Sequence, residues 1–168
     1  MATTANGIIY PVASDFVGPL NTHLQNLATS TQAAINLKAT YTPTLNNITL
    51  GNGSLYAYSG RSGAVIVDDI LITFGSTTTV SGVISLAALP VGEFLSSSNI
   101  LGGFATFYDL SATTTYSGVV MTNGTTVIPK IENVSGTYPT LADVNATVPF
   151  TWAVGDKLTI KTFRMTSN

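Results

Sequence analysis

The residues that could support catalysis are few and widely spaced. His23 is the single histidine, and the chain has no cysteine, which excludes disulfides, thiolate nucleophiles and thiolate metal ligands. A serine hydrolase would have to be built around His23, but the sequence has no Gly-x-Ser-x-Gly nucleophile elbow. We therefore interpret His23 as a side chain at the edge of a helical seam or on the surface.

Paired carboxylates occur once, at Asp68 and Asp69. Neighbouring residues of a strand point to opposite faces, so the pair could act jointly only if a β-bulge realigned it. The hydrophobic alternation changes phase at this pair, which predicts a bulge or a solvated strand. The alternative is a cation site that copies could share about a symmetry axis. The other acids are single: Asp15, Glu93, Asp109, Glu132, Asp143 and Asp156. We expect no enzyme, no cofactor and no metal site.

The composition indicates a β-rich chain whose surface is shared with neighbours. Charged residues make up 8% of it, where about 25% is usual, and the β-branched threonine that replaces them suits the solvent face of a sheet. Obligate interfaces are depleted in charge in the same way. The net charge of −2 argues against nucleic-acid binding, which needs a basic patch.

Neither a signal peptide nor a transmembrane helix is expected. The N-terminus lacks a basic region followed by a long apolar run, and no stretch approaches about 18 apolar residues. We therefore predict a protein made in a cytoplasm, without membrane insertion, that reaches the outside in a particle released by lysis.

Residues 1–40 are expected to form an N-terminal arm with one helix, which should begin near Pro19 because proline is tolerated in a first turn. Spacings of three and four residues then predict the seam of a short trimeric stalk. The alternative is an amphipathic helix packed on its own β domain, since so short a helix is marginal alone. The seam positions are Val17, Leu20, Leu24, Leu27, Thr31, Ala34 and Lys38.

Residues 41–168 are expected to form one domain, an antiparallel β-sandwich or jelly roll, so the fold class is mainly β with a short N-terminal helix. Strand-like runs alternate with Gly, Asn and Ser turns, and no helical crossover separates them. Residues 135–145 should form a loop. The expected strands are 45–50, 55–58, 64–74, 80–86, 100–110, 116–121, 126–134, 146–151 and 158–165.

Glycines mark the expected turns. Gly51 and Gly53 permit the positive φ angles of a tight hairpin between the first two strands. Asn123-Gly124 predicts a second hairpin, and the pair Gly102-Gly103 predicts that another backbone passes closely.

The end of the domain holds its most distinctive residues. Trp152 should plug the sandwich, with its indole N–H bound to a partner, and Gly155-Asp156 should turn the chain into the last strand. Aromatic side chains on the strands are interpreted as core or subunit-interface residues, with a carbohydrate-binding surface as the alternative. They are Tyr56, Tyr58, Phe104, Phe107, Tyr108 and Tyr116.

Three stretches together resemble a β domain that recurs in bacteriophage virion proteins, especially those of actinobacterial phages. They are Tyr41-Thr-Pro-Thr-Leu-Asn-Asn-Ile-Thr-Leu-Gly-Asn-Gly53, Phe74-Gly-Ser-Thr-Thr-Thr-Val-Ser-Gly-Val-Ile-Ser-Leu86 and Val148-Pro-Phe-Thr-Trp-Ala-Val-Gly-Asp-Lys-Leu158. Asn6-Gly-Ile-Ile-Tyr-Pro11 and Asp15-Phe-Val-Gly-Pro-Leu20 are similar to the virion-attachment segment that often precedes that domain. The ending, 161–168, departs from the Gly-Thr-Tyr-Glu type of finish that the resemblance leads one to expect.

The resemblance implies a trimeric structural protein of the virion, without catalytic residues. Its partners would be copies of itself, other virion proteins of tail or capsid, and a host cell-surface glycan. The first hypothesis is a minor tail or tail-fibre protein that recognises the host. The alternative, which the small size favours, is a capsid decoration protein. A glycan-degrading depolymerase conflicts with the lack of paired carboxylates at a plausible spacing.

Overall fold

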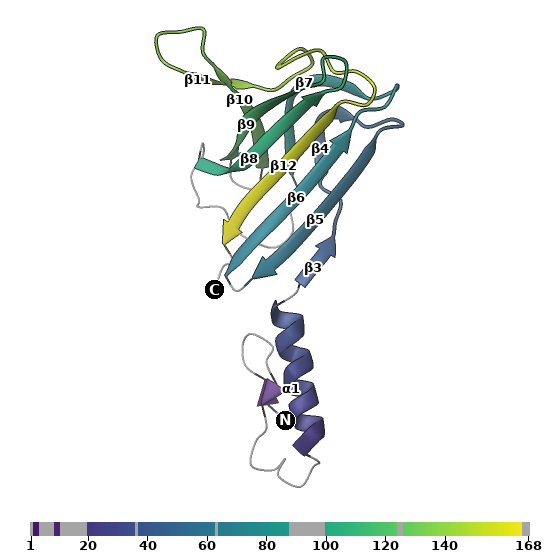
Figure 1. Cartoon of the computed structure of the whole chain (residues 1–168), viewed down its shortest axis with the longest axis vertical. Coiled ribbons are helices and arrows are strands. Elements are labelled where there is room, and N and C mark those ends of the chain that lie inside the picture. Colours follow the sequence, from purple (N-terminus) through teal and green to yellow (C-terminus); the bar gives the residue numbers. More distant parts are fainter. Residues whose placement is uncertain are drawn as a thin grey trace.

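The protein consists of a β head and a helical arm that projects from one end of it (Figure 1). The computed structural model describes residues 2–3, 9–10, 20–35, 37–62, 64–87, 100–123 and 126–165. The elements are β1 (Ala2–Thr3), β2 (Ile9–Tyr10), α1 (Leu20–Ile35), β3 (Leu37–Thr40), β4 (Thr44–Thr49), β5 (Ser54–Ser62), β6 (Val65–Thr73), β7 (Thr79–Ala87), β8 (Ile100–Asp109), β9 (Thr114–Asn123), β10 (Thr126–Asn133), β11 (Thr140–Asp143) and β12 (Lys157–Met165).

The head is one antiparallel sheet that curls into a sandwich-like fold, which confirms the predicted fold class. Its strand order is β3-β5-β6-β12-β8-β9-β10-β7-β4, and β11 pairs with β10. The two ends of this order, β3 and β4, are consecutive in the chain and joined by 41–43 alone. The sheet must therefore fold over until the end of β3 comes close to the start of β4.

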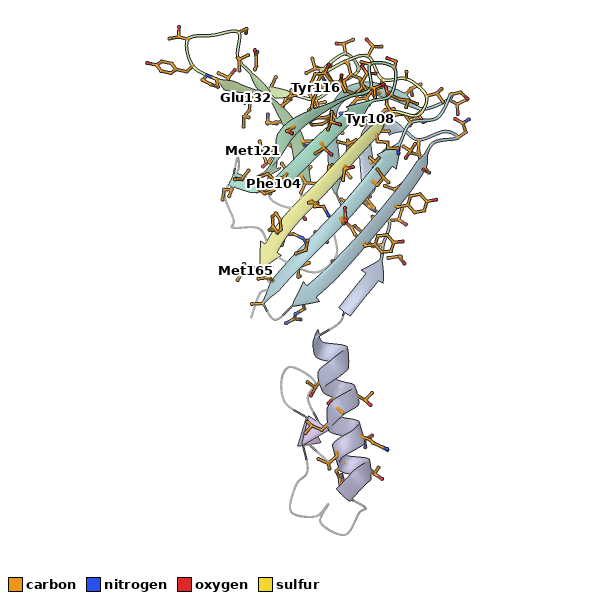
Figure 2. All side chains as sticks on the ribbon, viewed as in Figure 1. Phe104, Tyr108, Tyr116, Met121, Glu132 and Met165 are labelled. Carbon is orange, nitrogen blue, oxygen red and sulfur yellow. The ribbon has the colours of Figure 1, made fainter. Side chains whose placement is uncertain are left out.

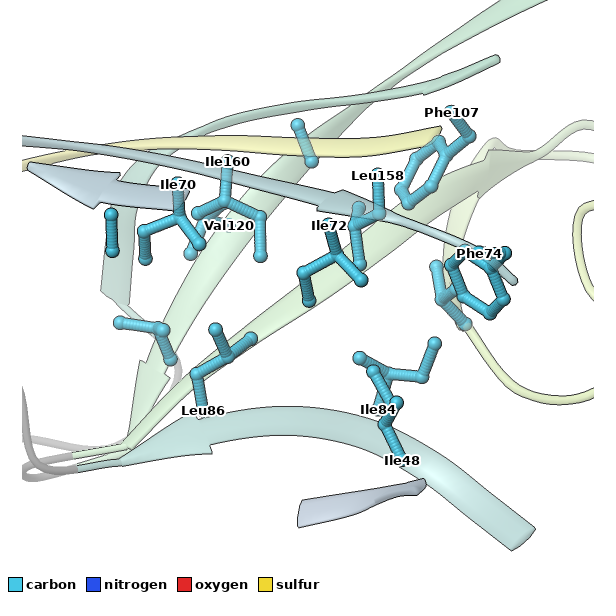
Figure 3. Close-up of a cluster of buried hydrophobic side chains, with 14 residues drawn as sticks. Ile48, Ile70, Ile72, Phe74, Ile84, Leu86, Phe107, Val120, Leu158 and Ile160 are labelled. Atoms are coloured by element: carbon cyan, nitrogen blue, oxygen red, sulfur yellow. The ribbon is translucent and has the colours of Figure 1, made fainter. Parts of the chain in front are cut away.

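The hydrophobic core lies inside this fold, between β6, β12 and β8 on one side and β4 and β7 on the other (Figure 3). Burial alternates residue by residue along β6 and β12, so each strand turns one row of side chains inward. Full burial of one such side chain contributes roughly 1.5–3 kcal/mol. The buried hydrophobic residues include Ile48, Ile70, Ile72, Ile84, Leu86, Phe107, Val120, Leu158 and Ile160.

The hairpin predicted between the first two strands is wrong. Gly51 does adopt a positive φ of 56°, but β4 pairs with β7 and β5 pairs with β6. The turn is held by residues further along the chain, because the backbone N–H of Asn52 donates to Thr77 Oγ1 (2.8 Å) and that of Thr77 donates to Asn52 Oδ1 (2.9 Å). Gly53 is needed for space instead of φ, since a Cβ there would lie 2.6 Å from the carbonyl oxygen of Thr73.

The other glycine predictions are confirmed. β9 and β10 form the expected hairpin, with Asn123 opposite Thr126. A Cβ on Gly103 would lie 1.9 Å from the carbonyl oxygen of Lys161, so β12 does pass closely. A bulge lies here, between Leu101 and Gly103, whereas the bulge predicted at 68–69 is wrong because β6 keeps an unbroken register with both neighbours.

Three predictions about individual segments are wrong. Residues 146–151 form no strand; an isolated bridge joins Asn145 and Val148, and the segment presents Phe150 and Trp152 to the core. Residues 37–40 were expected to end the arm, but they form β3. Pairing with β5 outweighs the local propensity of these residues. The expected loop 135–145 contains the short strand β11, which pairs with β10.

Trp152 closes the end of the sandwich far from the arm, as predicted. Its ring stacks on Phe74 with centroids 4.3 Å apart, and its indole N–H donates to the carbonyl oxygen of Asn145 at 2.9 Å. Gly155 turns the chain with a φ of 89°. Asp156, 1% exposed, then accepts hydrogen bonds from the backbone N–H groups of Leu110 (2.9 Å) and Ala153 (2.6 Å).

Asp156→Ala should destabilise the head, because it leaves two part-buried backbone N–H groups without the buried carboxylate that accepts from them. We expect the free energy of unfolding in urea to fall by about 3 kcal/mol. Asp109→Ala is the matched control: this carboxylate also accepts bonds within a turn, from Ser111 and Ala112, but the turn is exposed. A loss from Asp156→Ala no larger than that from the control would contradict the role assigned to Asp156.

Candidate interaction surfaces

The arm is built on α1, which begins directly after Pro19, as predicted. Figure 1 shows the helix extending away from the head along the direction of the sheet, with the β1–β2 pair at its side. Its contacts are with β2 and, where it joins the head, with β5. The alternative of a helix packed along its own sheet is therefore wrong for this structure.

The predicted seam is accessible on the arm. Leu24 is 56% exposed and Leu27 is 37% exposed, and residues three apart share a helix face. Thr31 is half-buried. Leu20 and Ala34 lie on α1, but their side chains, like all of Val17, are outside the described residues.

Two residues named with the seam take no part in a site. Lys38 lies beyond the end of α1, in β3 opposite Gly60, so it is not on the helix that carries the predicted seam positions. His23 is partly buried on α1, whereas every described carboxylate belongs to the head. The structure thus places no described acid on the same element as the histidine.

The pair Asp68 and Asp69 is split between the two faces of β6. Asp68 points inward, is fully buried, and binds Arg164 through both oxygens at 2.7 and 2.8 Å and Thr162 Oγ1 at 2.6 Å. Asp69 points outward and binds Lys161 Nζ at 2.8 Å. Each carboxylate therefore pairs with its own basic side chain on β12, and the two carboxylates do not act jointly within one copy.

Tyr41 lies beside the buried ion pair. Its hydroxyl is buried and has no hydrogen-bond partner among the described residues. Burial raises the pKa of Tyr41 well above its usual range, the negative charge of Asp68 raises it further, and Arg164 opposes the effect. The phenol therefore stays protonated, and this interior cluster is structural.

The aromatic residues named from the sequence divide between core and surface. Phe107 is fully buried and Tyr116 packs against Phe150 with centroids 5.5 Å apart. Tyr56, Tyr58 and Phe104 are exposed on the outer face of the sheet (Figure 2 labels Phe104). Tyr108 is half-buried near the end of β8.

An open groove of about 480 Å³ lies between β9, β10 and β11, and no local sequence pattern indicated it. Its lining holds one carboxylate and two hydroxyls but no second acid and no histidine, so it supplies no pair for acid–base catalysis. Across the described ranges, no three His, Asp or Glu side chains come together as metal ligands. The lining residues are Ser117, Gly118, Val119, Glu132, Pro139, Thr140 and Leu141.

Within the described residues, no helix has the length and apolar character that crossing a membrane requires.

Comparison with family models, with curated proteins and with solved structures finds no match to this chain.

Asp68→Asn should be strongly destabilising, because it leaves the buried guanidinium of Arg164 without a counter-charge. We expect a loss of roughly 3–5 kcal/mol in the free energy of unfolding. Asp69→Asn, one position along, removes an ion pair that is half exposed and should cost at most about 1 kcal/mol. Urea denaturation of both variants checks this, and equal effects would contradict the assignment of the two faces.

Proposed function

We propose that this chain is a trimeric, non-catalytic structural protein of a bacteriophage virion. Its arm anchors it to the particle, and the β head is displayed outward as a minor tail or tail-fibre protein. The observation that carries the proposal is the arm: α1 leaves the head and presents Leu24 and Leu27 to solvent. Such a helix needs partners of its own kind.

The energetics of the arm favour association. α1 has 16 residues, with no acidic residue in its first turn and no basic residue in its last, so charge does little to stabilise its ends. A helix of this length is marginal in water unless its apolar face is packed. Bringing copies together buries the leucines and stabilises the helix at the same time.

The segments that resemble phage proteins form one connected framework in the head. Asn52 of the first segment binds Thr77 of the second, and Phe74 of the second stacks on Trp152 of the third. The backbone N–H of Phe74 also donates to the carbonyl oxygen of Asp156 (2.9 Å). These residues hold the fold together. The resembling segments therefore support a likeness to the phage β domain in its structural framework.

Host recognition belongs, on this proposal, to the end of the head furthest from the arm. The turns there include exposed 111–115, and the β10–β11 connection adds exposed Val134 and Tyr138. A host cell-surface glycan is the partner that we propose for this end, with other virion proteins at the arm.

Labelling intact particles of the phage that encodes the chain tests the virion assignment. A specific antibody against the purified protein should mark the tail in electron micrographs, and prior incubation with the purified protein should abolish the label. Label on the head would replace the tail assignment with the decoration alternative. Particles that contain no copy by mass spectrometry would overturn the proposal.

Light scattering tests the trimer. The wild-type chain should give about three times 17.5 kDa, and Leu24→Asp should lower this mass, because unpaired charge in a desolvated seam is costly. Gln25→Asp, at the next position and also exposed, is the control and should leave the mass unchanged. A wild-type mass of 17.5 kDa would contradict the trimer.

A further inference from the structure

The outer face of the curled sheet carries an apolar surface that the arm does not cover. We name it the outer patch, and each of its side chains is between 37% and 58% exposed. Figure 2 labels two of its members, Phe104 and Met165. The outer patch comprises Val65, Val67, Leu101, Phe104, Phe163 and Met165.

The strand register makes these side chains contiguous. Val65 lies opposite Met165, and Val67 lies opposite Phe163, on neighbouring strands β6 and β12. Phe104, on β8 at the other side of β12, meets the Phe163 ring edge-on with centroids 6.0 Å apart. Opposite residues on one face of a sheet are within contact distance, so the outer patch is one surface across three strands.

The charges beside the outer patch neutralise each other. Asp69 and Lys161 flank it and are paired at 2.8 Å. A partner therefore needs no counter-charge to bind there. A strongly charged partner would meet no unpaired charge of opposite sign on these two residues. Apolar surfaces with few unpaired charges are typical of contacts between identical subunits.

The size and position of the outer patch fit contact with another copy of this chain. Six side chains, each about half exposed, offer on the order of 500 Å² of apolar surface. A stable contact buries about 800 Å² per partner. The arm can supply the remaining buried area, because Val65 and Met165 lie at the end of the sheet nearest the arm. There α1 leads into β3, which pairs with 58–61 of β5.

We infer that the outer patch is the surface through which the heads of neighbouring copies of this chain contact each other, extending the seam of the arm onto the sheet. This inference rests on the self-association proposed above, and it adds a contact between the heads to the contact between the arms. Association through the arm alone would leave the outer patch in water, whereas head contact removes most of it at once.

A charge-introducing variant tests the contact in the full chain. Phe163→Glu should weaken association roughly tenfold or more, because the carboxylate would be buried unpaired. Phe163→Leu, which keeps an apolar side chain, should retain association. Val154→Glu is the matched control: Val154 is 61% exposed in the turn before β12, outside the outer patch. Light scattering over a concentration series gives the association constant, and circular dichroism checks that each variant is folded.

Cross-linking adds a readout that instability cannot imitate. Since the chain has no cysteine, Phe163→Cys provides one thiol per copy, and a short bis-maleimide should join two copies; Val154→Cys should not be joined. A wild-type trimer that tolerates Phe163→Glu and leaves Phe163→Cys uncross-linked would overturn the head contact while the proposed arm-mediated trimer stands. A monomeric wild-type chain would overturn both.

Discussion

The corner at 41–43 is the constraint on which the head depends. It joins β3 and β4, the two ends of the strand order, and the backbone N–H of Tyr41 donates to the carbonyl oxygen of Ala57 as the chain leaves β3 (3.1 Å). Because so short a connection cannot span an open sheet, the sheet has to curl until the end of β3 lies close to the start of β4. The enclosed space is then filled by the inward rows of β6, β12, β4 and β7, and the core is a consequence of this closure.

The same corner determines where polar groups lie inside the head. It sets Tyr41 beside Asp68 and Arg164, and full pairing between the two charged groups is what makes their burial tolerable.

Local pattern was sufficient to predict elements whose period is regular. The heptad spacing of Leu24 and Leu27 gave the helix, and alternation gave β6, β7 and β12. Pairing choices were not predictable, because the partners of β4 and β5 are decided by the Asn52–Thr77 contact across the fold. Asp68 was misread as a bulge, although it keeps the phase of the buried isoleucines; its partner Arg164 is 96 residues away, so nothing local indicated an ion pair. The outer patch escaped notice because strand alternation does not tell which apolar row faces the core.

The scarcity of charge has a structural consequence that links fold and association. The three ion pairs described in the head, Lys130–Asp143, Lys161–Asp69 and Arg164–Asp68, each join two paired strands of the same head. Their charges are therefore satisfied within one copy and contribute little to attraction between copies. Contact between copies then has to come from burial of apolar surface, which is non-directional and insensitive to ionic strength. In the association that we propose, the helix aligns the arms and the outer face of the curled sheet meets its neighbour, and the shapes of these two surfaces define the geometry of the contact.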